Sequence, residues 1–241
     1  MKQTNKANGK AVRAPQFPVR FSARDFLEYA SYHAILARVV HDRSVIPLLG
    51  ELEGDILELG AGKHDYSTAA LKVKSYIRSD YKPPAGDSRI RIDATAIDFP
   101  DQRFDSVVCM SALEHIEDYE KVISETYRIL KPGGRFLLCT PWLFPYHGAP
   151  DDYTRFSPSL LRSKLSKFEI KSLHAVGNFW LSQAVFLQRP KWSRPQDATA
   201  PKLYDPVLRL IGMAFMAAGG GKCGDDDNYA LLYTALCRKP A

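Results

Sequence analysis

Between residues 55 and 140 the sequence alternates short apolar segments with segments of helical character, and this alternation limits the folds open to the chain. Helical spacing predicts helices over residues 66–73 and 118–130, and Pro132 with Gly133 ends the second of them. Strands that alternate with helices in this way predict βαβ units and a largely parallel sheet. The expected strands are residues 55–59, 75–80, 89–93, 104–110 and 135–140.

The rest of the chain is expected to extend this sheet and to cover it. Residues 168–175 and 229–237 have the character of two further strands. The expected helices lie within residues 21–49, 157–165 and 179–187, and a last one starts at Asp205-Pro206 after a proline-rich linker over residues 188–206. The sequence therefore predicts an α/β fold: a Rossmann-like, mostly parallel seven-stranded sheet with helices on both faces.

The length of 241 residues suits one domain with an insertion. We expect residues 1–20 to be a disordered basic tail and residues 21–241 to form a single domain. Its core would comprise residues 51–175 and 228–238, and a helical segment over residues 178–222 would be inserted before the last strand.

The net charge of +6 comes mainly from the N-terminal tail. Residues 1–20 hold five basic residues and no acid, which leaves 28 basic and 27 acidic residues in the rest of the chain. Nucleic-acid-binding proteins carry their basic residues on the fold itself. We therefore expect no nucleic-acid partner, and a tail that is too polar to fold alone.

The composition also predicts the compartment. No stretch approaches the ~20 apolar residues that span a bilayer, and the first twenty residues lack the apolar segment of a secretory signal. The four cysteines contain no C-x-x-C pair, as is typical of a reducing compartment. We expect a cytoplasmic protein without a transmembrane segment and without a metal site, since residues 225–227 read as a solvated acidic turn.

A glycine-containing turn follows the first expected strand. Gly60 and Gly62 stand where α/β sheets bind ligands beyond the carboxyl ends of their strands, and glycine lets the backbone approach a ligand closely. The dinucleotide fingerprint G-x-G-x-x-G is absent, because Asp65 stands at its last position. The phosphate-binding pattern G-K-[ST] is also absent, because Lys63 is followed by His64.

Acidic side chains accompany the expected strands at this edge of the sheet. Glu58 precedes the glycine turn, Asp80 ends the second strand and Asp93 ends the third. A carboxylate in the position of Asp80 can accept hydrogen bonds from ribose hydroxyls, and Asp93 could accept one from an adenine amino group. The acids therefore predict a ligand that carries a positive charge or many hydroxyl groups.

With these features the sequence resembles class I S-adenosylmethionine-dependent methyltransferases, of the broad group that acts on small molecules and glycans. The resemblance runs from Asp55 to Phe156 and, more weakly, to Ala241. One position departs from the family pattern, because His64 stands where the third glycine of the loop is usual. The segments that carry the resemblance are DILELGAG (55–62), YIRSDY (76–81), RIDAT (91–95), FDSVVCMSALEHI (104–116) and RILKPGGRFLLCTP (128–141).

The resemblance implies S-adenosylmethionine as the cofactor and assigns residues to its parts. Glu58 and the glycine loop would hold the methionine part, with Ser111 beside it. Asp80 would hold the ribose, and Asp93 with Ala94 the adenine. The residues expected to bind the cofactor are Glu58, Gly60, Ala61, Gly62, Asp80, Tyr81, Asp93, Ala94 and Ser111.

Two segments after the fourth and fifth strands are candidates for the acceptor site. His115 is either a general base for an acceptor hydroxyl or a residue that fixes the entry of the next helix. The loop 141–158 either recognises the acceptor or only holds the following helix. The candidate catalytic residues are His115 and His147, and the candidate substrate-binding residues are His147, Asp152, Tyr153 and Arg155.

The expected function is methyl transfer to a hydroxyl group. Residues 109–112 read Cys-Met-Ser-Ala where amino-methylating enzymes resembling this chain carry N/D-P-P-Y, which disfavours DNA adenine or protein glutamine as acceptors. We expect direct in-line O-methylation of a small molecule or of a sugar or polysaccharide precursor, with orientation supplying most of the catalysis. The alternative is a non-catalytic protein that keeps the fold as a binding or scaffold module. The apolar helix near residues 207–217 suits core packing or a homodimer contact.

Overall fold

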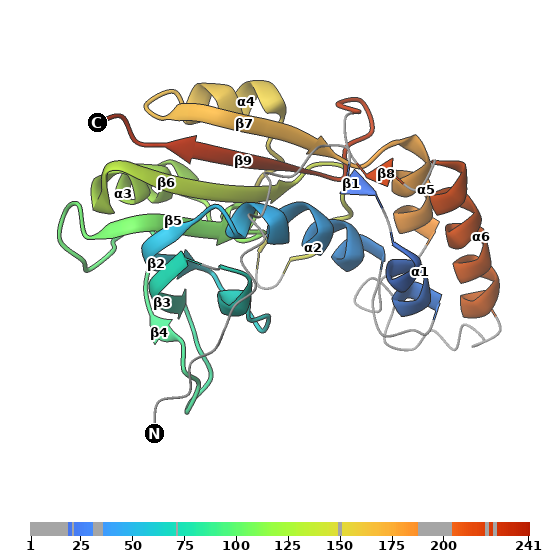
Figure 1. Ribbon diagram of the computed structural model, residues 1–241, viewed down its shortest axis with the longest axis horizontal. Helices are drawn as coiled ribbons and strands as arrows, with labels where there is room; N and C mark the ends of the chain where they lie inside the picture. Colours follow the sequence, from blue (N-terminus) through green and yellow to red (C-terminus); the bar gives the residue numbers. More distant parts are fainter. Residues whose placement is uncertain are drawn as a thin grey trace.

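The fold is known from a computed structural model, which confirms the expected α/β class. Its main sheet has seven strands in the order β4-β3-β2-β5-β6-β9-β7, parallel except for β9 (Figure 1). The strands are β2 (Glu53–Leu59), β3 (Lys72–Asp80), β4 (Ile90–Arg91), β5 (Phe104–Met110), β6 (Leu130–Pro141), β7 (Glu169–Val176) and β9 (Leu232–Arg238). The residues described are 19–20, 22–30, 36–70, 72–148, 151–187, 204–219, 222–223 and 226–241.

The strand order creates one switch point in the sheet. From β2 the chain moves outward to β3 and β4, and then returns to place β5 on the other side of β2. The connections that follow β2 and β5 therefore diverge, which leaves a crevice beyond the carboxyl ends of these two strands. This is the place where open α/β sheets bind ligands.

Helices cover both faces of the sheet, as expected. Successive strand residues point to opposite faces, so Leu57 belongs to one buried cluster and Ile56 to the other. One face packs on α2 and α5, and the opposite face packs on α3 and α4. The helices are α1 (Ala23–Ala30), α2 (Leu36–Leu49), α3 (Tyr119–Ile129), α4 (Pro158–Lys164), α5 (Phe179–Leu187) and α6 (Tyr204–Ala218), with short 3-10 turns η1 (Ser67–Ala69) and η2 (Leu113–His115).

The expected helix over residues 66–73 is wrong. Only the turn η1 forms, and β3 already begins at Lys72. The side chain of Tyr66 is drawn to α2 instead: its hydroxyl accepts a hydrogen bond from Arg38 Nη1 at 2.6 Å and donates one to Asp42 Oδ1 at 2.7 Å. Helix α2, which precedes the first strand of the main sheet, thus packs on the face that the missing helix would have covered.

The inserted helices stand where they were expected, before the last strand. Figure 1 shows α5 and α6 gathered with α1 beyond one end of the strands. The strands β1 (Val19–Arg20) and β8 (Lys222–Cys223) form a separate antiparallel pair. Residues 19–20 of the predicted disordered tail therefore have regular structure, and residues 1–18 and 188–203 lie outside the described part of the chain.

Among the described residues, no helix has both the length and the apolar character that a membrane span needs. Cys109, Cys139 and Cys237 are buried free thiols in the core, so these three cysteines do not form a disulfide scaffold.

Candidate cofactor and acceptor site

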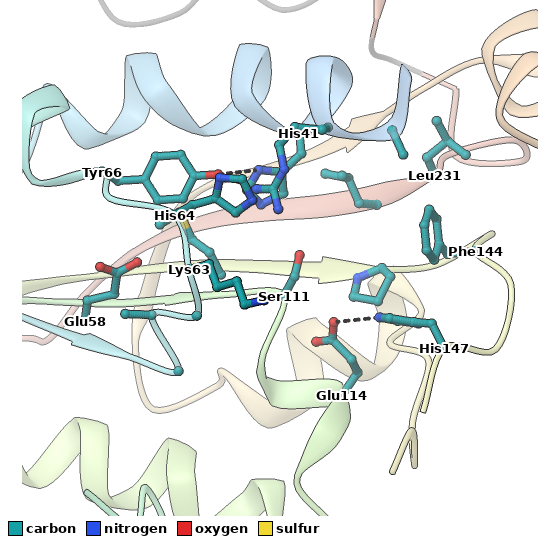
Figure 2. A pocket seen from close by; sticks show the side chains of 18 residues that line it. His41, Glu58, Lys63, His64, Tyr66, Ser111, Glu114, Phe144, His147 and Leu231 are labelled. Carbon is teal, nitrogen blue, oxygen red and sulfur yellow. Dashed lines mark hydrogen bonds and ion pairs between the residues drawn. The ribbon is translucent and has the colours of Figure 1, made fainter. Parts of the chain in front are cut away.

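A cavity of about 600 Å³ opens at the switch point of the sheet (Figure 2). Its walls come from the glycine loop after β2, the turn after β5, helix α2 and the loop after β6. The lining residues are Ala37, Arg38, His41, Glu58, Gly60, Ala61, Gly62, Lys63, His64, Tyr66, Met110, Ser111, Glu114, Pro141, Phe144, His147, Leu231 and Leu232. The structure thus brings the predicted residues Glu58, Gly60, Ala61, Gly62, Ser111 and His147 together around one space.

The glycine loop approaches the turn after β5 closely. Gly60 has a φ of +65° and Gly62 a φ of +54°, a region that side chains strongly disfavour. A Cβ atom on Gly60 would lie 2.4 Å from the Cβ of Ala112. The loop can therefore pack on Ala112 only because residue 60 is glycine. A Cβ atom on Gly62 would meet none of the described atoms within 4 Å, so the loop backbone is open to a ligand there.

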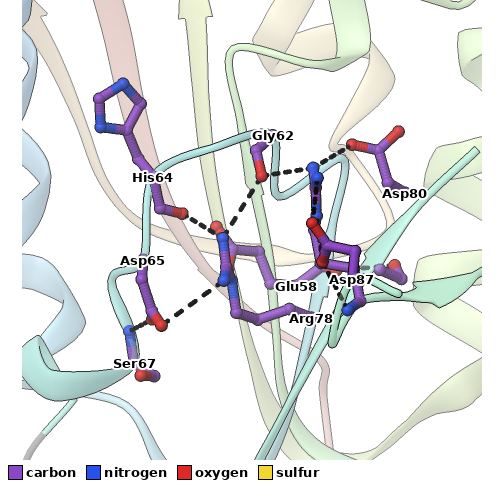
Figure 3. A network of polar contacts seen from close by, with 10 residues as sticks. Glu58, Gly62, His64, Asp65, Ser67, Arg78, Asp80 and Asp87 are labelled. Atoms are coloured by element: carbon purple, nitrogen blue, oxygen red, sulfur yellow. Dashed lines mark hydrogen bonds and ion pairs between the residues drawn. The ribbon is translucent and has the colours of Figure 1, made fainter. Parts of the chain in front are cut away.

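Two arginines hold the carbonyl groups of this loop (Figure 3). Arg78 on β3 donates hydrogen bonds to the carbonyl oxygens of His64, at 2.5 Å, and of Gly62, at 3.3 Å. Arg89 Nη1, from the connection before β4, also donates to the carbonyl oxygen of Gly62. These contacts fix the loop although His64 replaces the third glycine of the family pattern.

Glu58 is the buried acid of the site. Its side chain is only 2% exposed, and its Oε2 atom receives no hydrogen bond from the residues that the structure describes. Burial raises the pKa of Glu58 to about 7, against the attraction of Arg78, whose Nε lies 3.7 Å from Oε2. A carboxylate kept in this state attracts a cationic ligand.

Asp80 and Tyr81 lie at the end of β3, beside the cavity rather than in its lining. Asp80 Oδ2 accepts a hydrogen bond from Arg89 Nη1 at 3.0 Å. The same guanidinium donates to the carbonyl oxygen of Gly62, so it connects Asp80, the residue expected to bind the ribose, to the glycine loop. The carboxylate of Asp80 keeps a partly exposed surface. Tyr81 is 54% exposed, and the cationic groups of Lys82 and Arg91 lie over its ring.

Asp93 and Ala94 follow β4 on the same side and also lie outside the cavity lining. Asp93 is exposed, and its Oδ1 atom accepts hydrogen bonds from the backbone N–H and the hydroxyl of Thr95, which lower its pKa. The four predicted residues at positions 80, 81, 93 and 94 therefore follow the ends of β3 and β4 as an open shelf next to the cavity.

Ser111 stands where β5 ends. Its φ is +49°, and its backbone N–H donates to the carbonyl oxygen of Cys139 at 2.9 Å. This bond turns the chain sharply after β5 and directs the next residues under the cavity. Glu114 lies in that segment, and sequence reasoning missed it.

Glu114 faces two histidines, of which His147 lines the cavity with it and His115 lies just outside the lining. The Glu114 side chain is 0% exposed, and neither of its oxygens has a hydrogen-bond partner among the described residues. Its Oε1 lies 3.8 Å from His115 Nε2. It also lies 3.9 Å from His147 Nε2, and Figure 2 shows these two side chains facing each other. The two imidazole rings meet edge to face with centroids 4.9 Å apart. Burial raises the pKa of Glu114 to about 8.

The loop after β6 is held by an ion pair between two of the predicted substrate-binding residues. Arg155 binds both carboxylate oxygens of Asp152, whose side chain is 1% exposed, and this pairing lowers the pKa of Asp152 to about 2. Asp152 in turn accepts a hydrogen bond from the backbone N–H of His147 at 3.0 Å. Tyr153 is 48% exposed, and its backbone N–H donates to the carbonyl oxygen of Glu114 at 2.8 Å.

Basic residues on the opposite wall were also not foreseen. Arg38 and His41 come from α2, and Lys63 and His64 come from the glycine loop. The signal available in the sequence was weak, because α2 precedes the first strand of the main sheet and lies outside every quoted motif. The packing of α2 on the sheet, together with the hydrogen bonds of Tyr66, brings this helix to the cavity.

Comparison with known proteins agrees with the fold and the motifs. Residues 57–138 match the family model of a methyltransferase domain. The chain carries a class I S-adenosylmethionine-dependent methyltransferase domain. S-adenosylmethionine is the cofactor of this family, as the sequence motifs implied.

The methyltransferase domain also resembles curated and solved proteins. The chain is 34% identical over 117 residues to the demethylmenaquinone methyltransferase of Clavibacter sepedonicus, and the match covers 43% of this chain and 46% of that protein. The chain thus spans less than half the length of this relative. Solved structures share the fold: the SAM-dependent methyltransferase of Archaeoglobus fulgidus has 14% identity and a TM-score of 0.52 over 89% of this chain and 99% of that one. The YcgJ protein of Bacillus subtilis has 16% identity and a TM-score of 0.51 over 86% and 98%.

The residues present in the methyltransferase domain fit this cofactor. The Oε2 atom of Glu58 accepts no hydrogen bond from the described residues and is suited to a cationic group. The backbone at Gly62 is open, because a Cβ atom there would meet none of the described atoms within 4 Å. The exposed edge of Asp80 can accept hydrogen bonds from hydroxyl groups. The site therefore offers a carboxylate for the sulfonium cation, open backbone for the methionine part and a hydrogen-bond acceptor for the ribose hydroxyls.

Proposed function

We propose that this protein transfers the methyl group of S-adenosylmethionine to a hydroxyl oxygen of a small molecule bound in the cavity. The bound cofactor would supply an activated methyl group on a sulfonium cation. Glu58 and the loop from Gly60 to Gly62 would hold its methionine part, Asp80 its ribose, and the shelf at Asp93 and Ala94 its adenine. Ser111 would separate the cofactor from the acceptor.

The observation that carries this proposal is the cluster of Glu114, His115 and His147. Glu114 and His147 line the same cavity as the glycine loop, and His115 lies next to them, outside the lining, with its Nε2 atom 3.8 Å from Glu114 Oε1. An alcohol is a poor nucleophile until its proton is lost, whereas a buried carboxylate and two imidazoles can bind a hydroxyl and favour that loss. An acceptor that needed no deprotonation would gain nothing from such a cluster.

Asp152 and Arg155 would act as positioning residues for this cluster. Their ion pair orients His147, and Arg155 also donates to the carbonyl oxygens of Phe144 and Pro145. This arrangement leaves the two side chains little freedom to bind an acceptor themselves. Tyr153, which is exposed, is the better candidate for contact with an acceptor, and an aromatic face suits a sugar.

A second candidate function is methyl transfer to a ring carbon of a quinone precursor. Met110, Phe144, Leu231 and Leu232 give the cavity an apolar wall that suits a flat ring. Several curated relatives carry names of this kind, including the C-methyltransferase of ubiquinone and menaquinone biosynthesis in Enterobacter, which is 37% identical over 68 residues. The hydroxyls of a reduced quinone would meet the same polar floor.

The test is a panel of sugars, phenols and reduced quinones assayed for release of S-adenosylhomocysteine, with the product analysed by NMR. A methyl signal on oxygen supports the proposal, and one on carbon supports the second candidate. Binding of S-adenosylmethionine without turnover of any acceptor would favour a binding or scaffold role.

A matched pair of variants separates chemistry from structure. His115→Ala should lower kcat by about 10²–10⁴-fold with little change in KM or in cofactor affinity. His64→Ala, on the opposite wall, removes a cavity histidine outside the cluster and controls for lost packing. A fall in melting temperature that accounts for the activity lost in His115→Ala would contradict the role proposed for this residue.

A further inference from the structure

We infer that Glu114, His115 and His147 form a binding site for a divalent transition-metal ion, with Zn²⁺ as the best-matched species. One ligand atom from each residue lies within 4.8 Å of the other two. Two imidazole nitrogens and one carboxylate oxygen form a ligand set that suits Zn²⁺ and related ions. This inference departs from the sequence-based expectation that the chain has no metal site.

The hydrogen bonds of the two histidines set the tautomers that metal binding requires. His115 Nδ1 lies 2.6 Å from the carbonyl oxygen of Asp151, which can only accept, so the proton must be on Nδ1. His147 Nδ1 lies 3.2 Å from Asp152 Oδ2 and 3.3 Å from the carbonyl oxygen of Pro145, two further acceptors. In the neutral imidazoles, the lone pairs are therefore on the Nε2 atoms that face Glu114.

Histidines that ligate metals commonly donate their other N–H to a carbonyl or carboxylate, and both types of partner are present here. The carboxylate partner Asp152 is itself held by Arg155. Its charge is thereby compensated by the arginine, and Glu114 is the remaining anion at the centre of the cluster. The hydrogen-bond partners that would orient the two histidines around a metal ion are thus already in place.

Glu114 gives an independent reason to place a cation here. A completely buried carboxylate whose two oxygens accept no hydrogen bond from the described residues is costly to the fold. Binding a divalent ion would satisfy both oxygens and remove that cost. A simple proton shared with the histidines would satisfy only one of them.

The size of the cluster suits one ion after a small contraction. Ligand atoms bound at ~2.0–2.2 Å to one ion lie roughly 3.0–3.5 Å apart. The Glu114 Oε1 distances of 3.8 and 3.9 Å exceed this by less than about 1 Å, and the ligand atoms of the two histidines lie within 4.8 Å of each other. Three protein ligands leave coordination positions open toward the cavity, where Ser111 and Phe144 also face.

This inference deepens the proposed function and rests on it for its chemical role. A hydroxyl oxygen bound to the ion would become more acidic and would lose its proton to solvent water. The resulting alkoxide would form an O–CH₃ bond as the S–CH₃ bond of the sulfonium breaks, which gives an ether and a neutral thioether. Charge and atoms balance without any further reactant.

The test is metal binding by the full chain after treatment with EDTA. Calorimetry with Zn²⁺ should give one site per chain, and Co²⁺ should give visible absorption bands from the bound ion. Glu114→Gln keeps the shape of the side chain and should weaken Zn²⁺ binding at least ~100-fold, as should His147→Ala. His64→Ala, a histidine of the opposite wall, should bind Zn²⁺ like the wild type.

The outcomes are separable from those of the proposed function. Absence of a Zn²⁺ site in the wild type, or equal affinity in Glu114→Gln and His147→Ala when both retain the wild-type circular dichroism spectrum, would overturn the inference. Unchanged turnover in EDTA would overturn the role of the ion in acceptor binding while leaving methyl transfer intact. Binding of S-adenosylhomocysteine by the metal-free chain, measured by calorimetry, reports on the cofactor site alone.

Discussion

Glu58 should make the stability of this protein depend on pH near neutrality. The perturbation is Glu58→Gln, which keeps the size of the side chain and removes its ability to ionise. Burial raises the pKa of Glu58 from 4.5 to about 7, and at ~1.4 kcal/mol per pH unit this difference corresponds to about 3 kcal/mol. The side chain is only 2% exposed, so little of this energy is lost to solvent screening.

The sign follows from the two states of the chain. Below pH 4.5 the carboxyl is protonated in both the folded and the unfolded protein, and it costs nothing. Between pH 4.5 and about 7 the unfolded chain ionises while the folded chain must keep its proton, so the free energy of unfolding falls as pH rises. Above about pH 7 the loss is complete. Relative to wild type, Glu58→Gln should therefore gain up to about 3 kcal/mol at pH 8 and almost nothing at pH 4.5.

The assay is urea unfolding of both proteins without cofactor at several values between pH 5 and pH 8. Glu53→Gln, at the exposed start of the same strand, controls for the loss of one negative charge. Glu58→Gln should also bind S-adenosylmethionine more weakly at pH 8, because the cation of the cofactor loses its buried counter-charge. A stability difference that stays constant from pH 5 to pH 8 would refute the reasoning.

Three further predictions concern the loop, the ribose acid and the ion pair. Gly60→Ala should abolish cofactor binding in calorimetry and cost about 1–3 kcal/mol of stability, because its Cβ would collide with Ala112 at a positive φ; wild-type affinity would contradict this. Asp80→Ala should weaken S-adenosylmethionine binding by about 1.5–3 kcal/mol, the range of charged hydrogen bonds, and equal affinities would remove the ribose assignment. Arg155→Met should cost on the order of 3 kcal/mol in urea unfolding, since it leaves the buried carboxylate of Asp152 without its cationic partner; a loss below about 1 kcal/mol would show that the pair contributes little.

The local pattern of the sequence was enough to predict most of the sheet. Strand segments such as 104–110 are apolar over a short length and end at turn residues, and these are properties of neighbours along the chain. The place of the glycine turn followed in the same way. Gly60 and Gly62 do adopt positive φ values, because a parallel strand that must reverse into a ligand-binding loop needs residues without a Cβ atom.

The local pattern failed where distant residues competed for the same segment. Residues 66–73 have helical spacing, but Tyr66 forms hydrogen bonds with α2, and the chain enters β3 after a single turn. The spacing of apolar residues carries no information about such a partner. The same holds for Arg89, whose bond to Gly62 joins two loops that no motif connects.

The sequence by itself determined the fold class, the glycine loop and the acids at the strand ends. Only the tertiary structure decided the polar floor of the cavity, where Glu114 and His147 meet from loops that follow different strands. The physical reason is burial: Glu114 reads as an ordinary acid in a turn, and only the packing of the sheet and of the loop held by Asp152 and Arg155 removes it from water. A carboxylate becomes chemically distinctive when its solvent is taken away, and that is a property of the folded chain.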